Sequence, residues 1–579
     1  MRLSLPEFAV YTCLFLVFIF EALGLPFGRQ YARIFIGIFP LLLFSIDLVK
    51  KRQIKIPLYI TTLFILFSIM TAFSTITAIN IQTAFENQLM YWGVFLTFIY
   101  VFNHQKIKNR LPLFIFLMTL LLSIYAIYIN FFLPTNLSWL IPRGGFQFPY
   151  MYNSANSHFA FGSFILIPLV FIYRYFLEKP TWKRGLLLFL FLMLLIMSFL
   201  RAAYVAFLIV SFLSFYTSNV IKNRKFFLVF ICIIFLIFIS SFILITNFQN
   251  ETISNLPFKN IFVNHFELLK YKTFLNGRNE FMNQALEAIK ARPLTGFGSF
   301  NYYYASLLYA QNIPYTTGTS HNLFLDIFVE NGMLGGITFL ILILFLIKQL
   351  WPVITKKELL DTSIFLVILS LLILFQLSHY HKFYFLFLWV FVLSALLYKE
   401  KSVLKDSCNI TIISAVFLFF LTTIIGISLL LTNYKKYKEA LQIYPISVPA
   451  YQSYILSLHD QNKFHEAKIY IEKLSYLYPK EPNIQDFIGN IYTLNADHKD
   501  ALKHYQVALK FSPAEVAYLT FIYDEIQAIK GSEPAKKFIE RYISEHRSYF
   551  EIYTSENRWF YDWCIEREID IYKYMLPTK

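Results

Sequence analysis

Residues 185–219 read GLLLFLFLMLLIMSFLRAAYVAFLIVSFLSFYTSN, and this stretch decides the fold class. It is longer than the ~20 apolar residues that one membrane-spanning helix needs. Its one charged residue, Arg201, lies in the middle. We therefore predict two spanning helices, 185–200 and 202–219, joined by a tight turn at Arg201.

The composition of the whole chain supports a membrane protein with some soluble mass attached. The 579 residues are 57% hydrophobic and 15% charged, with a mean hydropathy of +0.54, whereas a soluble domain carries about 25% charged residues. A soluble cytosolic enzyme is excluded. The net charge of +16 does not indicate nucleic-acid binding, because the basic residues lie in short clusters between apolar runs, where they orient spans in a bilayer.

Apolar runs extend the prediction to thirteen helices, the first of them uncleaved because no small-residue cleavage site follows it. The predicted ranges are 7–25, 32–49, 57–78, 86–102, 111–133, 157–177, 185–200, 202–219, 226–246, 321–347, 363–379, 382–398 and 410–432. The four cysteines are scattered and predict neither a disulfide framework nor a zinc site. We expect no metal and no cofactor.

The loops between these ranges differ in charge. One alternating set holds 20 basic residues, whereas the opposite short loops hold only Arg29, Arg33, Arg143, Arg201 and Lys382. Positive residues accumulate on the cytoplasmic side. We therefore expect a cytoplasmic N-terminus, with the loop 247–320 and the segment 434–579 on the periplasmic or external side.

The segment 434–579 has its own composition and a 34-residue period. Prolines and alanines recur at Pro445, Pro479 and Pro513 and at Ala467, Ala501 and Ala535. The middle unit, 482–515, resembles the tetratricopeptide repeat through Gly489, Tyr492, Ala501, Tyr505, Ala508 and Pro513. The flanking units depart from that pattern at Ile455 and Tyr523. We expect a soluble α-solenoid with the capacity to bind a partner; the alternative is a generic helical tail with a chance period.

Charged and titratable residues near the external face are the candidates for chemistry, because membrane helices avoid charge. Arg201 ends one predicted span, where a terminal arginine often only extends to the interface. Arg278 begins an amphipathic stretch, 281–290, and a cation at a helix N-terminus is unfavourable unless an anion is also there. His321 begins the span 321–347, with Ser320 as its expected cap.

Two acids and a histidine pair complete the candidates. Asp326 and Glu330 lie within an apolar span, so we expect them to face protein or water. His379 and His381 lie beside Lys382 and are read most simply as interfacial residues.

These residues together resemble the O-antigen ligase, O-antigen polymerase and O-oligosaccharyltransferase superfamily, over roughly 140–400. The motif His-Asn-x-x-Leu-x-x-x-x-Glu-x-Gly-x-x-Gly occupies 321–335, and Gly-Arg followed by Ala-Leu, Pro and Gly-x-Gly occupies 277–300. Arg201 stands at the place of the family's Ser-Arg-Gly-Ala turn, although the flanking residues differ. The stretch from Gly145 to Ala160 resembles the family's Asn-containing start of the next span.

The resemblance implies an all-α, GT-C-like bundle (1–433) in a bacterial inner membrane that transfers a glycan without a metal. The donor would be a polyprenyl-diphosphate-linked glycan, and the acceptor lipid A-core, a growing polymer or a protein hydroxyl. By resemblance, His321 is the base or acceptor-positioning group, and Arg201 and Arg278 bind the diphosphate. The residues that would shape the substrate pocket are Arg143, Asn156, Asn322 and Glu330.

Two readings from other classes stay open. A lipid-linked glycan transporter also has many spans and a few interior charges, although transporters concentrate them near the bilayer midplane. A membrane-anchored repeat scaffold without chemistry does not explain the motifs between 277 and 335.

Overall fold

The computed structural model describes most of the chain as helices. The described residues are 4–22, 28–50, 53–132, 157–197, 200–217, 278–309, 317–356, 358–378, 384–400, 402–406, 409–550 and 558–569. The predicted span 226–246 and the first part of the predicted external loop, 247–277, lie outside them.

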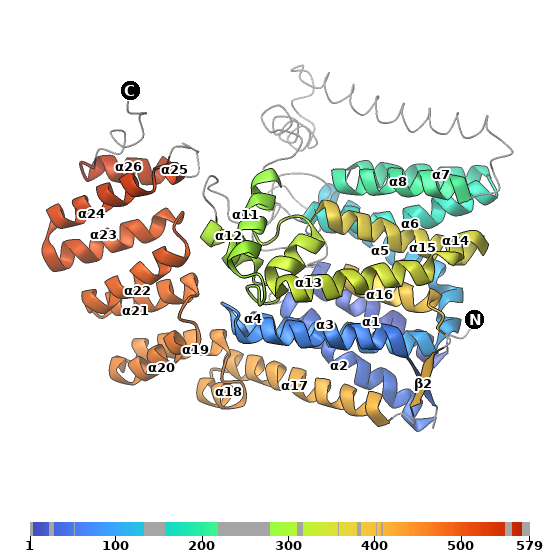
Figure 1. Cartoon of the computed structure of the whole chain (residues 1–579), viewed down its shortest axis with the longest axis horizontal. Coiled ribbons are helices and arrows are strands. Elements are labelled where there is room, and N and C mark those ends of the chain that lie inside the picture. The colour runs from blue at the N-terminus through green and yellow to red at the C-terminus, as the bar shows by residue number, and fades with distance from the viewer. Residues whose placement is uncertain are drawn as a thin grey trace, which may run out of the picture.

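Every predicted span within the described residues contains a helix. In chain order these are α1 (Leu5–Ala22), α2 (Gly28–Val49), α3 (Leu58–Ile76), α4 (Ile81–Asn103), α5 (Leu111–Phe132), α6 (Ser157–Glu178), α7 (Trp182–Met197), α8 (Arg201–Thr217), α13 (Leu323–Leu350), α15 (Leu359–Leu377), α16 (Tyr384–Leu397) and α17 (Asn409–Asn433). The predicted break at Arg201 is confirmed, since α7 ends at Met197 and α8 begins at Arg201. The helices run side by side as one bundle (Figure 1).

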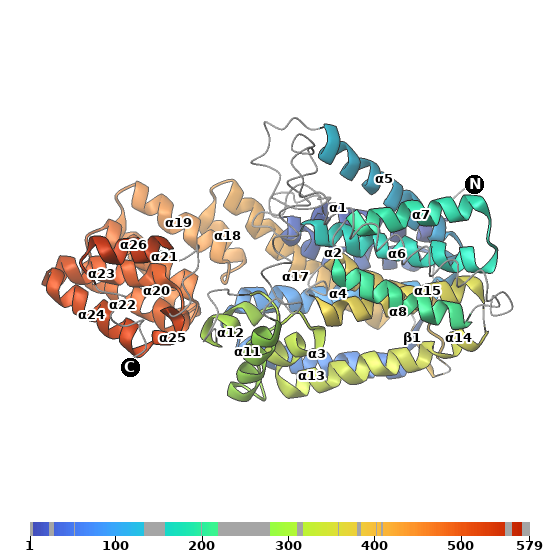
Figure 2. The same cartoon turned by 90° about the horizontal axis from the view of Figure 1, so that it is seen from above.

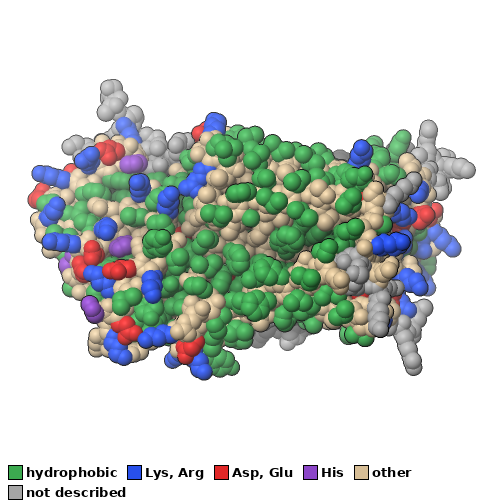
Figure 3. Space-filling view, turned by 60° about the horizontal axis from the view of Figure 1, so that its bottom comes forward, with side chains coloured by type: hydrophobic (Ala, Val, Ile, Leu, Met, Phe, Trp, Pro, Cys, Tyr) green, Lys and Arg blue, Asp and Glu red, His purple; other side chains and the backbone are tan. Residues whose placement is uncertain are grey.

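The bundle has the surface of a multi-pass membrane protein. Among the described helices, five stretches are long and apolar enough to cross a bilayer: Tyr31–Val49, Leu58–Ile76, Leu323–Lys356, Leu359–Leu377 and Asn409–Asn433. On the face drawn in Figure 3, apolar side chains cover the middle of the molecule and Lys and Arg gather toward its two ends. A protein that spans a bilayer presents such an apolar belt to the lipid, with charged residues at the two ends.

The all-α prediction holds for the membrane bundle, and one small strand pair adds to it within the described part of the chain. Strand β1 (Ile54–Pro57) pairs antiparallel with β2 (Val403–Asp406), with Lys55 opposite Lys405. The loops that follow α2 and α16 emerge at the same end of the bundle (Figure 1). Two adjacent extended loops satisfy their backbone N–H and C=O groups by pairing with each other. Two short helices lie in connections between spans. The 3-10 helix η1 (Gln105–Arg110) connects α4 to α5, and helix α14 (Pro352–Lys356) connects α13 to α15.

The opposite end of the bundle carries the segments that are predicted to be external, and we name it the external end after that prediction. Two short helices, α11 (Arg278–Ala291) and α12 (Tyr302–Tyr309), lie there beside the C-terminal domain (Figure 2). They share a small core with α13 that is separate from the core of the bundle, formed by Ile79, Ala285, Ala288, Phe297, Tyr302, Ala305 and Val329.

The C-terminal domain consists of helix pairs at the predicted period. After α18 (Tyr437–Ile443), pairs begin at Val448, Pro482 and Val516, which are 34 residues apart. The pairs are α19 (Val448–Asp460) with α20 (Phe464–Leu477), α21 (Pro482–Leu494) with α22 (His498–Phe511), and α23 (Val516–Lys530) with α24 (Ser532–Glu545); α25 (Arg547–Phe550) and α26 (Arg558–Glu566) follow. A Cβ atom at Gly489 would lie 2.6 Å from Tyr505 Cε1, so the glycine allows α21 and α22 to approach closely. The tetratricopeptide assignment itself stays a prediction.

Candidate functional site

His321 lies in a turn at the external end of the bundle, immediately before α13. Its backbone is in the left-handed region, with φ of 62°, a conformation that a residue with a side chain adopts only when its surroundings hold it there. Its imidazole stacks on the ring of Phe281 in α11, with centroids 5.5 Å apart and planes 21° apart. The turn before α13 and the first turn of α11 therefore meet at His321.

Asp326 fixes the turn that carries His321. Its fully buried carboxylate accepts hydrogen bonds from the Ser320 backbone N–H (2.6 Å) and the Ser320 hydroxyl (2.5 Å). It also accepts one from the Thr319 hydroxyl, whose oxygen in turn accepts the His321 N–H at 3.0 Å. The prediction that the Asp326 side chain faces protein or water is confirmed, because the carboxylate is buried and bound by Ser320 and Thr319.

Asn322, and not the expected Ser320, caps α13. Its Oδ1 accepts a hydrogen bond from the Leu325 N–H at 3.1 Å, and its Nδ2 donates to the Gln376 carbonyl of α15 at 3.3 Å. The prediction of Ser320 as the cap is wrong because its hydroxyl is bound by Asp326. Asn322 thus joins α13 to α15 directly beside His321; its predicted contact with substrate stays a prediction.

Helix α13 is broken at Gly332, where φ is 68° and ψ is 179°. The glycine-containing turn 292–298 lies against the break, and a Cβ atom at Gly332 would overlap the Leu294 carbonyl. Three backbone hydrogen bonds join the two: Phe297 N–H to Val329 O (3.0 Å), Gly298 N–H to Glu330 O (2.8 Å) and Met333 N–H to Pro293 O (2.7 Å). The turn therefore satisfies the backbone groups that the break frees, which the interior of a membrane protein requires.

Glu330 lies on the last turn before this break. Its side chain is buried, and its carbonyl also accepts the Ser74 hydroxyl at 2.5 Å. Together with Asp326, it places two buried carboxyls at the external end of α13. Burial and then these two negative charges raise the pKa of Tyr302 well above its ordinary value. Tyr302 donates to the Phe281 carbonyl at 2.9 Å, and so holds the helix whose ring lies against His321.

The structure brings some of the predicted site residues together. Arg278 is half-buried at the start of α11, three residues before Phe281, and side chains three apart share one helix face. Arg278 therefore lies within one helical turn of the residue that stacks on His321, and its place in the site stays a prediction. Arg201 begins α8, but its side chain lies outside the described residues, as do Arg143, Asn156, His379, His381 and Lys382.

The residues that support His321 were only partly visible in the sequence. Phe281 lies in the predicted amphipathic stretch 281–290, but nothing in the sequence indicates that its ring stacks on His321. Thr319 and Tyr302 were missed, since a hydroxyl residue in a loop has no distinctive pattern. The described part of the chain contains no group of three or more His, Cys, Asp or Glu side chains that could hold a metal ion.

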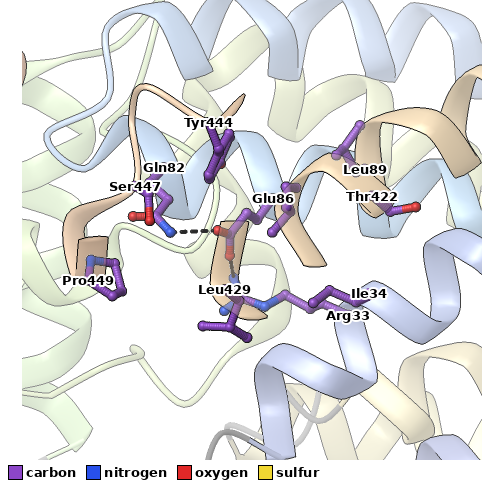
Figure 4. Close-up of a pocket in the computed structure, with 11 residues that line it drawn as sticks. Arg33, Ile34, Gln82, Glu86, Leu89, Thr422, Leu429, Tyr444, Ser447 and Pro449 are labelled. Carbon is purple, nitrogen blue, oxygen red and sulfur yellow. Dashed lines mark hydrogen bonds and ion pairs between the residues drawn. The ribbon is translucent and has the colours of Figure 1, made fainter. Parts of the chain in front are cut away.

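A second polar cluster, which the sequence did not indicate, attaches the C-terminal domain to the bundle. Arg33 of α2 and Glu86 of α4 form a buried ion pair at 2.9 Å. The Gln82 side-chain N–H donates to Glu86 at 2.7 Å (Figure 4). Its side-chain oxygen accepts the Val448 N–H at 2.8 Å. The cavity among them, about 20 Å³, has room for about one water molecule. This cluster is therefore a closely packed contact between the bundle and the C-terminal domain.

A further contact lies at α12. Asn80 donates to the Tyr304 hydroxyl at 3.1 Å. The Tyr304 side chain lies beside the Glu481 carboxyl, which caps the N-terminus of α21. Burial raises the pKa of Glu481. The C-terminal domain is thus attached to the external end of the bundle through at least two polar contacts.

The comparisons with known proteins agree with the site's location. Residues 186–340 match the family model described as O-Antigen ligase. No curated protein matches the chain. The matched segment runs from α7 through α13 and contains Arg201, Arg278, His321, Asn322 and Glu330, whereas Arg143 and Asn156 precede it. The segment that holds the candidate site is therefore similar to the O-antigen ligase family, which supports the resemblance to that superfamily.

Proposed function

We propose that this chain is a membrane glycosyltransferase that moves a glycan from a polyprenyl-diphosphate carrier to an acceptor hydroxyl on the external face of the inner membrane. The observation that carries the proposal is the His321 turn. A buried carboxylate holds it against the helix that starts at Arg278, within the segment similar to O-antigen ligases.

The reaction is a displacement at the anomeric carbon. Neutral His321 accepts the proton of the acceptor hydroxyl, the hydroxyl oxygen forms a bond to the anomeric carbon, and the bond from that carbon to the diphosphate oxygen breaks. Arg278 and Arg201 stabilise the negative charge that develops on the departing diphosphate, since a guanidinium binds phosphate oxygens bidentately. Histidine suits the first role because its ordinary pKa leaves neutral imidazole available at pH 7.

The acceptor is lipid A-core or a protein hydroxyl in the ligase reading. The C-terminal domain supports this reading over a bare polymerase, because it places a large soluble surface beside the external end of the bundle (Figure 2). Deleting 434–579 tests its role in acceptor choice. We expect transfer to the natural acceptor to fall; unchanged transfer to every acceptor would show that the domain is dispensable.

Substitution of the three candidate residues tests the chemistry. We expect His321→Ala, Arg201→Ala and Arg278→Ala to abolish transfer at normal expression, while His465→Ala, an exposed histidine of α20, leaves it intact. The readout is the profile of surface glycolipids and glycoproteins in a deletion strain. Lost long-chain lipopolysaccharide with accumulated carrier-linked polymer indicates a ligase, single-repeat chains a polymerase, and lost protein glycans a protein glycosyltransferase. Full activity in all three variants would refute the proposal.

A lipid-linked glycan transporter is the second candidate, and the break in α13 is the observation that favours it, since transporters use discontinuous helices at their binding sites. Purified protein in liposomes separates the two. Release of carrier diphosphate with a new glycoside supports the transferase, whereas movement of labelled lipid across the bilayer without cleavage supports the transporter.

A further inference from the structure

A groove lies between the external end of the bundle and the C-terminal domain. It has a volume of about 730 Å³. Its walls come from three segments that are far apart in the sequence: 76–79 after α3, 291–295 after α11, and Tyr476, Leu477, Pro479 and Lys480 after α20. α11 is 14 residues long, or about 20 Å, with Phe281 near its start and the groove at its end, so the groove is separate from the His321 junction.

Two cations line the groove. The Arg292 guanidinium lies 4.4 Å above the Phe297 ring and donates to the Thr77 carbonyl at 3.4 Å. Burial lowers the pKa of Arg292, which means that part of its hydration has been lost. Within the described part of the chain, neither Arg292 nor Lys480 forms an ion pair with a carboxylate. A partly desolvated cation without a carboxylate favours an anionic ligand.

The rim of the groove is apolar and exposed. Ile76, the last residue of α3, is 74% exposed and Leu294 is 69% exposed. Ile76 continues the exposed apolar face of α3, and Leu294 lies against Gly332 of α13. Both helices can cross a membrane. Tyr476, which is 85% exposed, stands on the opposite wall. An aromatic and two cations directly above an exposed apolar surface are the arrangement found where a span meets the lipid head groups.

We propose that this groove binds the phosphate of an anionic membrane-lipid head group. Arg292 and Lys480 bind the phosphate oxygens, while Ile76 and Leu294 contact the acyl chains. The occupant is a lipid and not a free anion, because the cations and the exposed apolar rim belong to one groove. The proposal does not rest on glycan transfer, since binding requires neither a glycan donor nor His321.

Lipid binding to the purified full-length chain in detergent tests the proposal. The probes are dioleoyl phosphatidic acid, dioleoylglycerol, which has the same chains without the phosphate, and inorganic phosphate, measured by native mass spectrometry. We expect the chain to bind phosphatidic acid in preference to dioleoylglycerol. Arg292→Gln with Lys480→Gln should weaken that binding at least tenfold, because each basic residue near a lipid surface contributes appreciably to anionic-lipid binding.

Matched variants separate a local site from a general charge effect. Arg292→Lys with native Lys480 keeps both charges and should retain binding, and Lys510→Gln together with Lys537→Gln removes two exposed cations from other helices of the domain and should also retain it. Three results would each overturn the proposal: equal binding of phosphatidic acid and dioleoylglycerol, displacement of the lipid by millimolar inorganic phosphate, or equal weakening by the control pair. All are measured without glycan donor, so they are independent of the transferase test.

Discussion

The substitution Asp326→Asn tests whether the His321 turn positions a reacting group. The change keeps the shape of the side chain but removes its charge and replaces one acceptor oxygen with an NH₂ donor. In the native structure the carboxylate accepts three hydrogen bonds, two from Ser320 and one from Thr319, and is fully buried. The asparagine can keep the two hydrogen bonds from Ser320 to its remaining oxygen, but its NH₂ group then faces the Thr319 hydroxyl, which donated to the second carboxylate oxygen.

The magnitude follows from these contacts. A hydrogen bond to a charged group contributes about 1.5–3 kcal/mol, and the left-handed conformation of His321 costs about 1–2 kcal/mol that the turn must offset. Losing one such bond and weakening the others therefore removes about 3 kcal/mol of preference for the native turn. If the imidazole must occupy its native place in the transition state, the rate falls about 100-fold.

The assay is glycan transfer by purified protein, with donor and acceptor varied separately. We expect the loss in the rate constant at saturation, with KM for the donor nearly unchanged, because the turn and not the diphosphate contact is altered. Asp361→Asn is the matched control, since Asp361 is also a buried aspartate but pairs with Lys108 at 3.1 Å elsewhere in the bundle. A transfer rate within threefold of wild type for Asp326→Asn, or an equal loss in Asp361→Asn, would refute the reasoning.

Three further predictions concern the break in α13, the contact between the bundle and the C-terminal domain, and the pH dependence of that domain's stability. Gly332→Ala should destabilise the fold by about 3 kcal/mol and abolish transfer, because φ is 68° and the new Cβ overlaps a carbonyl; Gly318→Ala, which meets nothing within 4 Å, should be tolerated in the same thermal unfolding assay. Glu86→Gln should cost about 3 kcal/mol, because it removes the carboxylate charge that pairs with the largely buried Arg33 guanidinium. The double change Arg33→Met with Glu86→Leu should cost less than the sum of Arg33→Met and Glu86→Leu measured singly, and additive losses would contradict this. Burial lowers the pKa of His504 in α22 to about 4, below the unfolded value near 6.5. The stability that the neutral imidazole gives the folded state is therefore present above pH 6.5 and is lost as the pH falls toward 4. Hydrogen exchange should show α22 less stable by about 1–2 kcal/mol at pH 5 than at pH 7.5, and His504→Gln should reduce that difference.

Helix positions were predictable because they depend on local composition. Apolar runs of span length predicted a helix in each described range, and the single arginine in 185–219 predicted the break between α7 and α8. The 34-residue recurrence of small residues and prolines predicted the spacing of the helix pairs, since each pair repeats one local pattern. The β1–β2 ribbon escaped prediction because its two strands are some 350 residues apart and pair only when the bundle brings them to one end.

The candidate site divides in the same way. The amino-acid order alone places His321, Arg278 and Arg201 in motifs that resemble those of one superfamily, together with two glycine-containing segments near 296 and 332. Three contacts depend on the folded chain: Asp326 holds the His321 turn, the turn 292–298 completes the broken helix, and Gln82, bound to Glu86, attaches the C-terminal domain at Val448. The physical reason is that a motif records which residue types occur at a local spacing, whereas a buried carboxylate or a freed carbonyl takes whichever partner folding places within hydrogen-bond distance.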